Sequence, residues 1–388
     1  MARLLDVQAF AEFSAGMLVS GTFCMLGCMG LQAMLQRELP INLLRGQESR
    51  GLILAAQCNL VALACFFVGF LAALSGLSIA GMPPMLLATG FLHGLSQQMF
   101  LIATVESRSR GQAMRFAQQN LVRALAALLL GAGVAASTGS AQMSLAIEAS
   151  VSIALSVHFF YKSVLRSHLR SSAVYRLAMR RLRLVSWRSA TTLLAISVVG
   201  FLLINVDRWV AAGQLGVDGF AQYSFAWIVL IVAQSLQAVI NAAAYPAVAR
   251  RFATYGSYSA FRICMQLSAV TLLIGALCIV PAWFAIDFGM RRWFPMYADT
   301  IAFLPLFLVV AVLRASDFWS SYLLIIGREA ALLTINTVAA IVGILLWTFL
   351  MRLRQSRLEP YDVALLAVVL TILGYVAAAG FAWRARTV

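Results

Sequence analysis

Long apolar segments recur from one end of this 388-residue chain to the other. Each is close to the roughly 20 residues that an α-helix needs to cross the hydrocarbon core of a bilayer. They lack the short alternating pattern of membrane β-strands. We therefore expect eleven membrane-spanning helices, at about 11–36, 51–76, 79–104, 116–137, 141–161, 189–212, 219–249, 258–285, 299–327, 330–351 and 361–383.

A basic segment, 162–188, divides these helices into two groups. It holds eight of the 29 basic residues of the chain, Lys162 included. We predict an all-α polytopic membrane protein with an N-terminal lobe of five helices (1–161) and a C-terminal lobe of six (189–388) around a central cavity.

The basic segment has a helical pattern of its own. One predicted face carries Arg176, Arg180 and Arg183, and another carries Val174, Leu177 and Leu184. This pattern predicts an amphipathic helix on the inner leaflet. A solvated irregular linker is the alternative.

The composition agrees with a membrane protein. Hydrophobic residues make up 62% of the chain and charged residues 11%, whereas soluble domains carry about 25% charged residues. The net charge is +15. In a soluble protein that charge would favour nucleic acid, but in a membrane protein basic loops hold the cytoplasmic side and contact anionic lipid. We expect anionic membrane lipid as a partner and no nucleic acid.

The basic loops also predict an orientation in the membrane. With the central segment in the cytoplasm, most loop arginines fall on that side, the N-terminus lies outside and the C-terminus inside. The basic loop 352–357 opposes this assignment. No cleavable signal peptide is evident. The six cysteines lie within the spans without metal-ligand spacing, and the chain has no phosphate-binding loop of ATPases. We expect neither an enzyme nor a metal or organic cofactor.

The two halves contain a weak internal repeat. VQAFAEFS (7–14) aligns with VDGFAQYS (217–224) at an offset of 210, and LQAML (31–35) with LQAVI (236–240) at 205. Both copies run in the same predicted direction, which indicates a parallel repeat. The second copy follows a span and the first does not. We therefore expect that one N-terminal helix of a twelve-helix pattern is missing.

Two segments carry a family resemblance. INVDRWVAAGQLGVDGFAQYSFAW (204–227), followed by AAAYPAVARRFA (242–253), resembles the oligosaccharide-lipid flippase branch of the MOP exporter superfamily. The copy at 10–50 resembles the second helix of that family, so the first helix would be absent. The resemblance implies two lobes around a cavity and alternating access. Its implied cargo is an undecaprenyl-diphosphate-linked oligosaccharide, and Na⁺ or H⁺ coupling is common. Polysaccharide polymerase and chain-length proteins are implied partners.

Charged residues at membrane depth are costly and are therefore functional candidates. Arg123, Arg208 and Arg314 lie within spans, and Arg37 lies at the predicted inner mouth. We consider them candidate ligands for a diphosphate, because guanidinium groups bind such oxygens in a bidentate manner. Topology anchoring or structural pairing is the alternative for each.

Three carboxylates are candidates for ion coupling: Asp207, Asp317 and Glu148. Arg314 and Asp317 are three apart within the predicted span 299–327, so they share a helical face and can pair. Glu148 and His158 lie on one helix about 15 Å apart, which excludes direct contact and leaves a proton relay as one interpretation. For His93, beside Gln97 and Gln98, a hydrogen-bonded helix contact is the simpler interpretation.

A polar stripe on span 219–249 comprises Gln234, Gln237 and Asn241. Amides are expensive in lipid, so we expect them to face other helices or a cavity, where they would bind sugar hydroxyls. A drug or cation antiporter of the same superfamily is the alternative function. A glycan polymerase or ligase and a non-transporting scaffold of a glycan-assembly complex are the alternatives from other classes.

Overall fold

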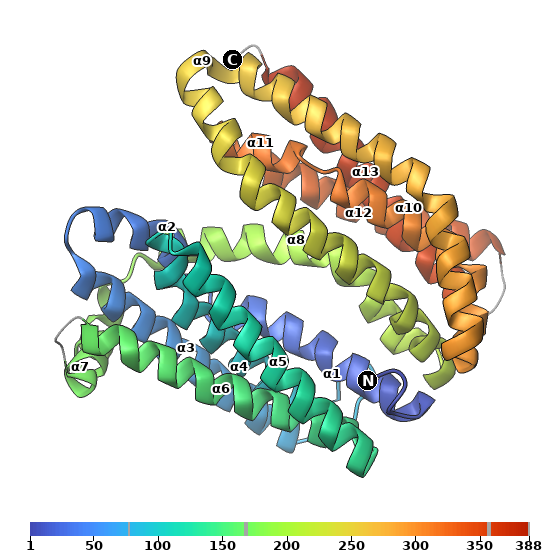
Figure 1. The fold of residues 1–388 in the computed structure, drawn as a ribbon, viewed down its shortest axis with the longest axis horizontal. Helices are drawn as coiled ribbons and strands as arrows, with labels where there is room; N and C mark the ends of the chain where they lie inside the picture. The colour runs from blue at the N-terminus through green and yellow to red at the C-terminus, as the bar shows by residue number, and fades with distance from the viewer. Residues whose placement is uncertain (77, 167–169, 355–357, 387–388) are drawn as a thin grey trace. The chain divides into compact units, whose positions relative to one another are not determined.

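The computed structural model describes residues 1–388 except 77, 167–169, 355–357 and 387–388, and except the side chains of 166, 238, 239, 241–243, 245–247, 249 and 253. The described residues form only helices and their connections (Figure 1). Eleven of the described helical segments are long and apolar enough to cross a membrane, as the hydrophobic pattern predicts. The chain forms two compact units, Met1–Val198 and Val199–Val388.

The N-terminal unit is built around one central helix. Its elements are α1 (Val7–Leu26), α2 (Leu31–Leu44), α3 (Glu48–Leu74), α4 (Pro84–Ser109), α5 (Ala113–Thr138), α6 (Ala141–Arg166), α7 (Ser171–Arg181) and η1 (Leu182–Leu184), followed by the first part of α8 (Trp187–Gln214). Helix α4 packs against α1, α3 and α6, and α5 covers α6. Much of α3 and α4 is buried, whereas α5 is mostly exposed on a surface suited to lipid.

The predicted span 11–36 is wrong as a single helix. Helix α1 ends at Leu26, and the chain turns before α2 begins at Leu31. Gly30 allows this turn because its φ is +82° and its Cα lies against the Ala190 carbonyl, where a Cβ would clash. The two aligned repeat segments both begin helices, at Val7 and Val217. The change in their offset therefore falls at this turn.

The central basic segment contains helix α7, whose buried face differs from the apolar face expected from the sequence. Val174 and Ala178 are buried and pack with Ile53 and Ala56 of α3. Leu184, assigned to the same face from the sequence, is 80% exposed. The helix therefore docks on α3 through Val174 and Ala178, and Leu177 remains outside that contact.

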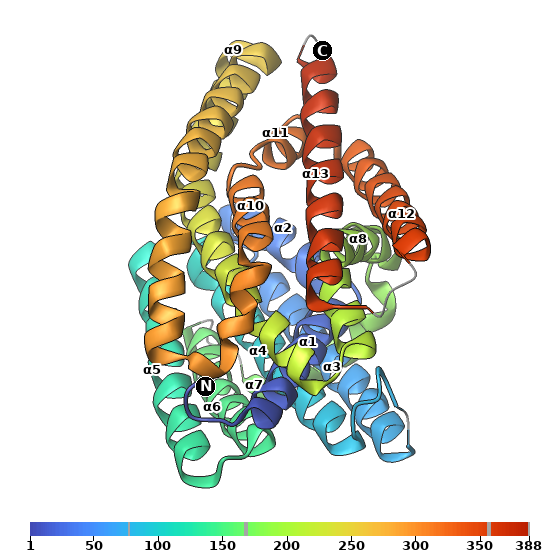
Figure 2. The same cartoon turned by 90° about the vertical axis from the view of Figure 1, so that its right-hand side faces the viewer.

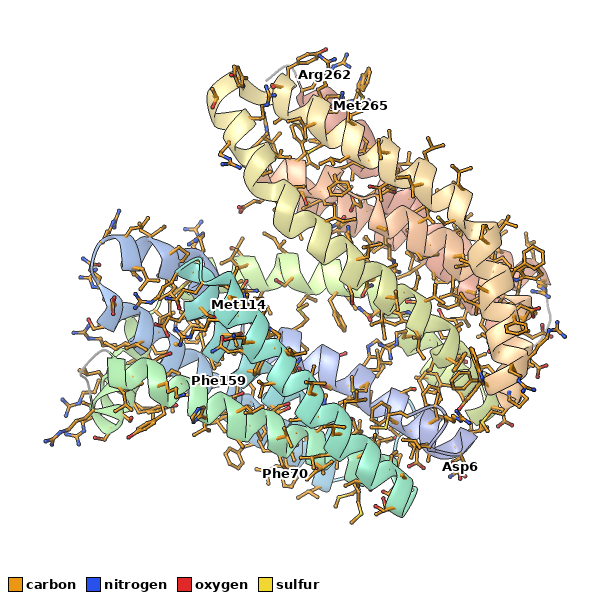
Figure 3. All side chains as sticks on the ribbon, in the orientation of Figure 1. Asp6, Phe70, Met114, Phe159, Arg262 and Met265 are labelled. Carbon is orange, nitrogen blue, oxygen red and sulfur yellow. The ribbon has the colours of Figure 1, made fainter. Side chains whose placement is uncertain are left out.

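The C-terminal unit contains the second part of α8 and α9 (Val217–Trp293), which consists of two helical arms joined by a kink. We predicted two separate spans here, 219–249 and 258–285. Two helical arms correspond to these spans and meet at Gly256, which turns the backbone with φ +77° and ψ −175°, a conformation almost confined to glycine. Figure 1 shows the two arms of α9 meeting at this sharp turn, and Figure 3 marks Arg262 and Met265 just beyond it on the second arm.

The remaining elements pack beside α9. They are η2 (Pro295–Ala302), α10 (Leu304–Ala315), α11 (Trp319–Ile325), α12 (Glu329–Arg354) and α13 (Pro360–Ala385). Helix α10 contacts α9 and α13, and α12 packs on α13 (Figure 2). The predicted span 299–327 is therefore three pieces, because the helix ends at Ala315 and starts again at Trp319.

Candidate functional site

A polar cavity of about 250 Å³ lies within the C-terminal unit. Residues of α8, α9, α10, α12 and α13 line it, together with the α10–α11 break. Its polar side chains are Gln234, Gln237, Arg314, Asp317, Ser320, Asn336, Thr371 and Tyr375. Four of these were candidates from the sequence, and the fold brings them together. Asn336 and Thr371 were missed, because single polar residues in an apolar span give no pattern until their neighbours are known.

Arg314 is buried inside the C-terminal unit, at 8% exposed. Its Nε donates to Thr371 Oγ1 at 3.4 Å, and one Nη donates to the Ile204 carbonyl at 3.2 Å. Its other Nη has no hydrogen-bond partner among the described residues. Neutral acceptors therefore hold the guanidinium in place, and the buried second Nη has unused hydrogen-bonding capacity.

Asp317 departs from the sequence prediction of a pair with Arg314. The α10 helix ends between them, so the three-residue spacing no longer places the side chains together. Asp317 instead begins α11: its Oδ1 accepts from the Ser320 backbone N–H at 3.2 Å and its Oδ2 from the Ser320 hydroxyl at 2.8 Å. Carboxylates at helix N-termini are stabilised in this way. The Asp317 backbone carbonyl also accepts from Gln237 Nε2, at 3.3 Å.

Asp207 lies in the packed interior of the C-terminal unit and is fully buried. The Tyr223 hydroxyl donates to its Oδ2 at 2.5 Å, and Oδ1 has no partner among the described residues. Tyr223 is in turn fixed between Phe303 and Phe307, with ring centroids at 6.4 and 5.2 Å. A buried carboxyl held by a buried phenol is a high-cost arrangement that only a rigid surround maintains.

Arg208 has a different environment from its neighbour Asp207. Its guanidinium carbon lies 4.3 Å from the centroid of the Trp227 ring, a cation–π geometry. Successive helical residues point about 100° apart, which explains why these two adjacent charges have separate partners. Neither residue lines the 250 Å³ cavity.

A second polar cavity, of about 430 Å³, lies within the N-terminal unit between α1, α4, α5 and α6. Its polar side chains are Ser20, His93, Gln97, Asn120, Arg123 and Glu148. Arg123 and Glu148, both candidates from the sequence, therefore belong to one site.

A chain of polar contacts joins those two charges. Glu148 Oε2 lies 3.5 Å from His93 Nε2, and His93 Nδ1 lies 2.8 Å from the Ser20 hydroxyl. Gln97 Nε2 is 3.4 Å from His93 Nε2, and Gln97 Oε1 accepts from Arg123. The Arg123 guanidinium also lies over the Phe100 ring, 4.4 Å from its centroid. Its Nε has no partner in the described part of the chain.

The partner of Glu148 is thus His93 and not His158. His158 is exposed and lies beside the Phe159 ring, with centroids 5.7 Å apart. His93, interpreted from the sequence as a simple helix contact, does make such contacts but also faces the carboxylate. Gly131 on α5 makes room for this pair, because a Cβ there would lie 2.5 Å from Glu148 Oε1.

The last two sequence candidates lie elsewhere. Arg37 is exposed on α2, where it donates to the Ser189 hydroxyl at 3.1 Å and lies 3.9 Å from Glu38. This contact ties α2 to the start of α8 outside both cavities. The side chain of Asn241 lies outside the described residues.

Comparison with known proteins finds likeness at the level of structure. A scan against protein-family models finds no match, and a search of curated proteins finds none. Among solved structures, the chain is similar to an inward-facing multidrug resistance MATE family transporter of the MOP superfamily, at 14% identity and a TM-score of 0.66, covering 100% of this chain and 95% of that one.

Two further structures agree. One is a MATE protein in the bent conformation, at 13% identity and a TM-score of 0.58, with 100% and 93% of the two chains covered. The other is an outward-facing multidrug resistance MATE family transporter, at 13% identity and a TM-score of 0.54. That match covers 100% of this chain and 97% of the other. At these identities the likeness establishes the fold. The all-α polytopic class is confirmed, and the fold is the one seen in these MATE structures.

Proposed function

We propose that this chain is an alternating-access transporter that moves a lipid-diphosphate-linked oligosaccharide across the bacterial cytoplasmic membrane. The observation that carries the proposal is the pair Arg123 and Arg314. Each lines a polar cavity within its own unit, and each retains an N–H group with no partner among the described residues. Arginine at membrane depth is costly unless it serves a site.

The residues around Arg314 support a cargo with phosphate and hydroxyl groups. A planar guanidinium presents donors in a geometry that matches phosphoryl oxygens. Gln234 and Asn336 line the same cavity, and Gln234 Nε2 has no partner within the described structure. Amides both donate and accept, so they suit the hydroxyl groups of a sugar.

Coupling to an ion gradient is assigned to Glu148. Of the three candidate carboxylates, Asp317 has both oxygens committed to the start of α11, and Asp207 is buried beneath Tyr223. Glu148 lines the N-terminal cavity and faces an imidazole. Binding of H⁺ or Na⁺ there would change the charge presented to Arg123 through His93 and Gln97.

A second candidate function is a drug or cation antiporter. The observation in its favour is the same Glu148 carboxylate, which would attract a cationic cargo into the N-terminal cavity. The proteins with similar structures are described as multidrug resistance transporters. The charges in the cavities favour the anionic cargo. Both cavities contain an arginine, but the Asp317 carboxylate in the C-terminal cavity is already bonded at the start of α11, which leaves Glu148 as the carboxylate that could attract a cation.

A transport assay on the purified full chain separates the two functions. Proteoliposomes are loaded with a fluorescent polyprenyl-diphosphate-linked disaccharide, with its monophosphate analogue, or with a cationic dye, under imposed pH and Na⁺ gradients. We expect translocation of the diphosphate lipid in preference to the monophosphate and no movement of the dye. Dye movement without lipid translocation would establish the antiporter, and movement of neither would contradict both transport functions.

In the cell, the proposal places the N-terminus outside and the C-terminus in the cytoplasm, with polysaccharide polymerase and chain-length proteins acting on the exported product. Accumulation of lipid-linked glycan in a deletion strain, together with translocation in proteoliposomes, supports transport. Accumulation without translocation by the purified chain supports a scaffold instead.

A further inference from the structure

An amphipathic pocket at one end of the N-terminal unit has no part in the proposed transport cycle. Its volume is about 510 Å³, and it lies between α2, α3 and the segment that links α7 to α8. Its lining combines two arginines, Arg50 and Arg181, with polar and apolar side chains. The polar ones are Glu38, Asn42, Gln57 and Ser186, and the apolar ones are Met34, Ile53, Leu54, Leu184 and Val185.

The walls of this pocket are fixed by packing. Val174 and Ala178 of α7 are buried against α3, and Gln57 Nε2 donates to the Ala178 carbonyl at 3.3 Å. Beyond α7, Leu182 and Val185 pack against the core of the unit. The linking segment is therefore held on the unit on both sides of Leu184, and the pocket is a preformed feature.

Leu184 does not follow its neighbours into the core. Leu184 is 80% exposed, although Leu182 and Val185 on either side of it pack against the core of the unit. Leu44, at the end of the neighbouring α2, is 90% exposed and precedes Arg45. An exposed leucine beside an arginine is costly in water but favourable at the boundary between headgroups and acyl chains.

We propose that this pocket binds an anionic phospholipid, with the headgroup phosphate between Arg50 and Arg181 and an acyl chain along Leu184 and Leu54. Basic pockets between helices at the inner leaflet recognise anionic headgroups. The charge pattern of the chain places this end in the cytoplasm, where anionic lipid is present. Arg50 is supported by Gln47, whose Oε1 accepts from Nη1 at 2.9 Å. Glu38 shares the pocket and is 3.9 Å from Arg37, which offsets its charge.

The α7 arginines offer a matched control. Arg176 and Arg180 are exposed on the same helix as Arg181 and do not line the pocket. The variants R50Q/R181Q and R176Q/R180Q therefore remove the same charge, and only the first removes it from the pocket. Native mass spectrometry of the detergent-solubilised full chain, titrated with phosphatidylglycerol, phosphatidylcholine or inorganic phosphate, measures binding directly.

We expect the wild type and R176Q/R180Q to retain one tightly bound phosphatidylglycerol, and R50Q/R181Q to bind it about tenfold more weakly or worse, since each arginine near an anionic headgroup contributes several-fold to affinity. Phosphatidylcholine and phosphate should bind weakly to all forms. Equal loss in the two variants would mean a diffuse charge effect, and no loss in either would mean no site; both results overturn the proposal. Phosphate binding as tight as that of the lipid would also overturn it.

If R50Q/R181Q does not fold, Leu184→Ser tests the apolar half of the same pocket, because an 80% exposed side chain contributes little to folding. This variant should weaken phosphatidylglycerol binding several-fold while leaving the arginines in place. Unchanged affinity for long-chain lipid would contradict the seating of an acyl chain on Leu184.

Discussion

Arg314 keeps its charge inside the C-terminal unit with only neutral atoms as hydrogen-bond partners. An ion pair would have neutralised it and made it a structural element, as the expected contact with Asp317 implied. The break between α10 and α11 prevents that pair and gives Asp317 to the start of α11. The break therefore leaves Arg314, at the cavity wall, without a carboxylate hydrogen-bond partner among the described residues.

The hydrogen bond between Tyr223 and Asp207 gives a first residue-level prediction. Tyr223→Phe leaves a fully buried carboxylate without its described donor, and such losses cost about 1–3 kcal/mol. We expect a lower melting temperature for the purified protein in detergent. Tyr361→Phe, at a tyrosine 40% exposed at the start of α13, is the control and should melt like the wild type. Equal melting of Y223F and the wild type would show that the bond adds nothing.

Gly131 gives a second prediction, on the contact between Glu148 and His93. Alanine at 131 would press on the Glu148 side chain, whereas alanine at 133, on the same helix, meets nothing within 4 Å. We expect G131A to shift the pH dependence of transport and G133A to leave it unchanged. Alanine raises helix propensity equally at both positions, so the pair isolates the contact. Identical pH profiles for the two variants would contradict a coupling role for Glu148.

Much of the candidate site could be predicted from residue types, and its pairings could not. Arg123, Arg314 and Glu148 were found because charges in apolar segments are conspicuous. The sequence indicates partners only within one helix, where spacing is known, so Glu148 was compared with His158. Its actual neighbour, His93, comes from another helix, and only the packing of α4 on α6 brings them together.

At the scale of elements, helix interiors were predictable and helix ends were not. Hydropathy located all eleven spans, because burial in lipid requires long apolar segments. The break after α1 was missed because Met29 and Gly30 adopt positive φ, +47° and +82°, within a segment that remains apolar. The two arms of α9 were predicted as separate spans, and their junction at Gly256 lies between those predicted spans.

The turn between α1 and α2 leads to a prediction about folding. Gly30→Ala introduces both positive-φ strain and a clash with the backbone carbonyl of Ala190, and backbone strain alone costs about 1–3 kcal/mol. Gly46→Ala has a similar φ of +69° with nothing within 4 Å. We expect G30A to lower the yield of monodisperse protein well below that of G46A in fluorescence-detected size-exclusion chromatography. Similar yields would mean that the α2–α8 contact is not tight.

At the scale of the whole chain, the charge pattern predicts the orientation. The eleven candidate spans in the described residues would place the termini on opposite sides, and the arginine-rich loops favour a cytoplasmic C-terminus. The basic end of α12 opposed this assignment. In the structure Arg354 is paired with the buried Asp362, whose backbone carbonyl also accepts from the Trp347 indole at 2.8 Å. Arg354 therefore has a local structural role, and its position is weaker evidence that loop 352–357 lies in the cytoplasm.

A fusion experiment tests the orientation. A fluorescent protein that matures only in the cytoplasm should fluoresce at the C-terminus, and alkaline phosphatase fused there should be inactive. Phosphatase fused to the N-terminus behind a secretion signal should be active. An active C-terminal phosphatase would reverse the orientation and move the proposed lipid pocket to the outer leaflet.

The central claim is that Arg123 and Arg314 bind the phosphorylated part of the cargo. The most direct measurement is the rate at which proteoliposomes translocate the fluorescent polyprenyl-diphosphate disaccharide, compared between R123Q/R314Q and R250Q/R262Q, which removes two exposed arginines instead. We predict at least a tenfold lower rate for R123Q/R314Q and a wild-type rate for R250Q/R262Q. Equal rates for the two variants, with both proteins folded, would contradict the claim.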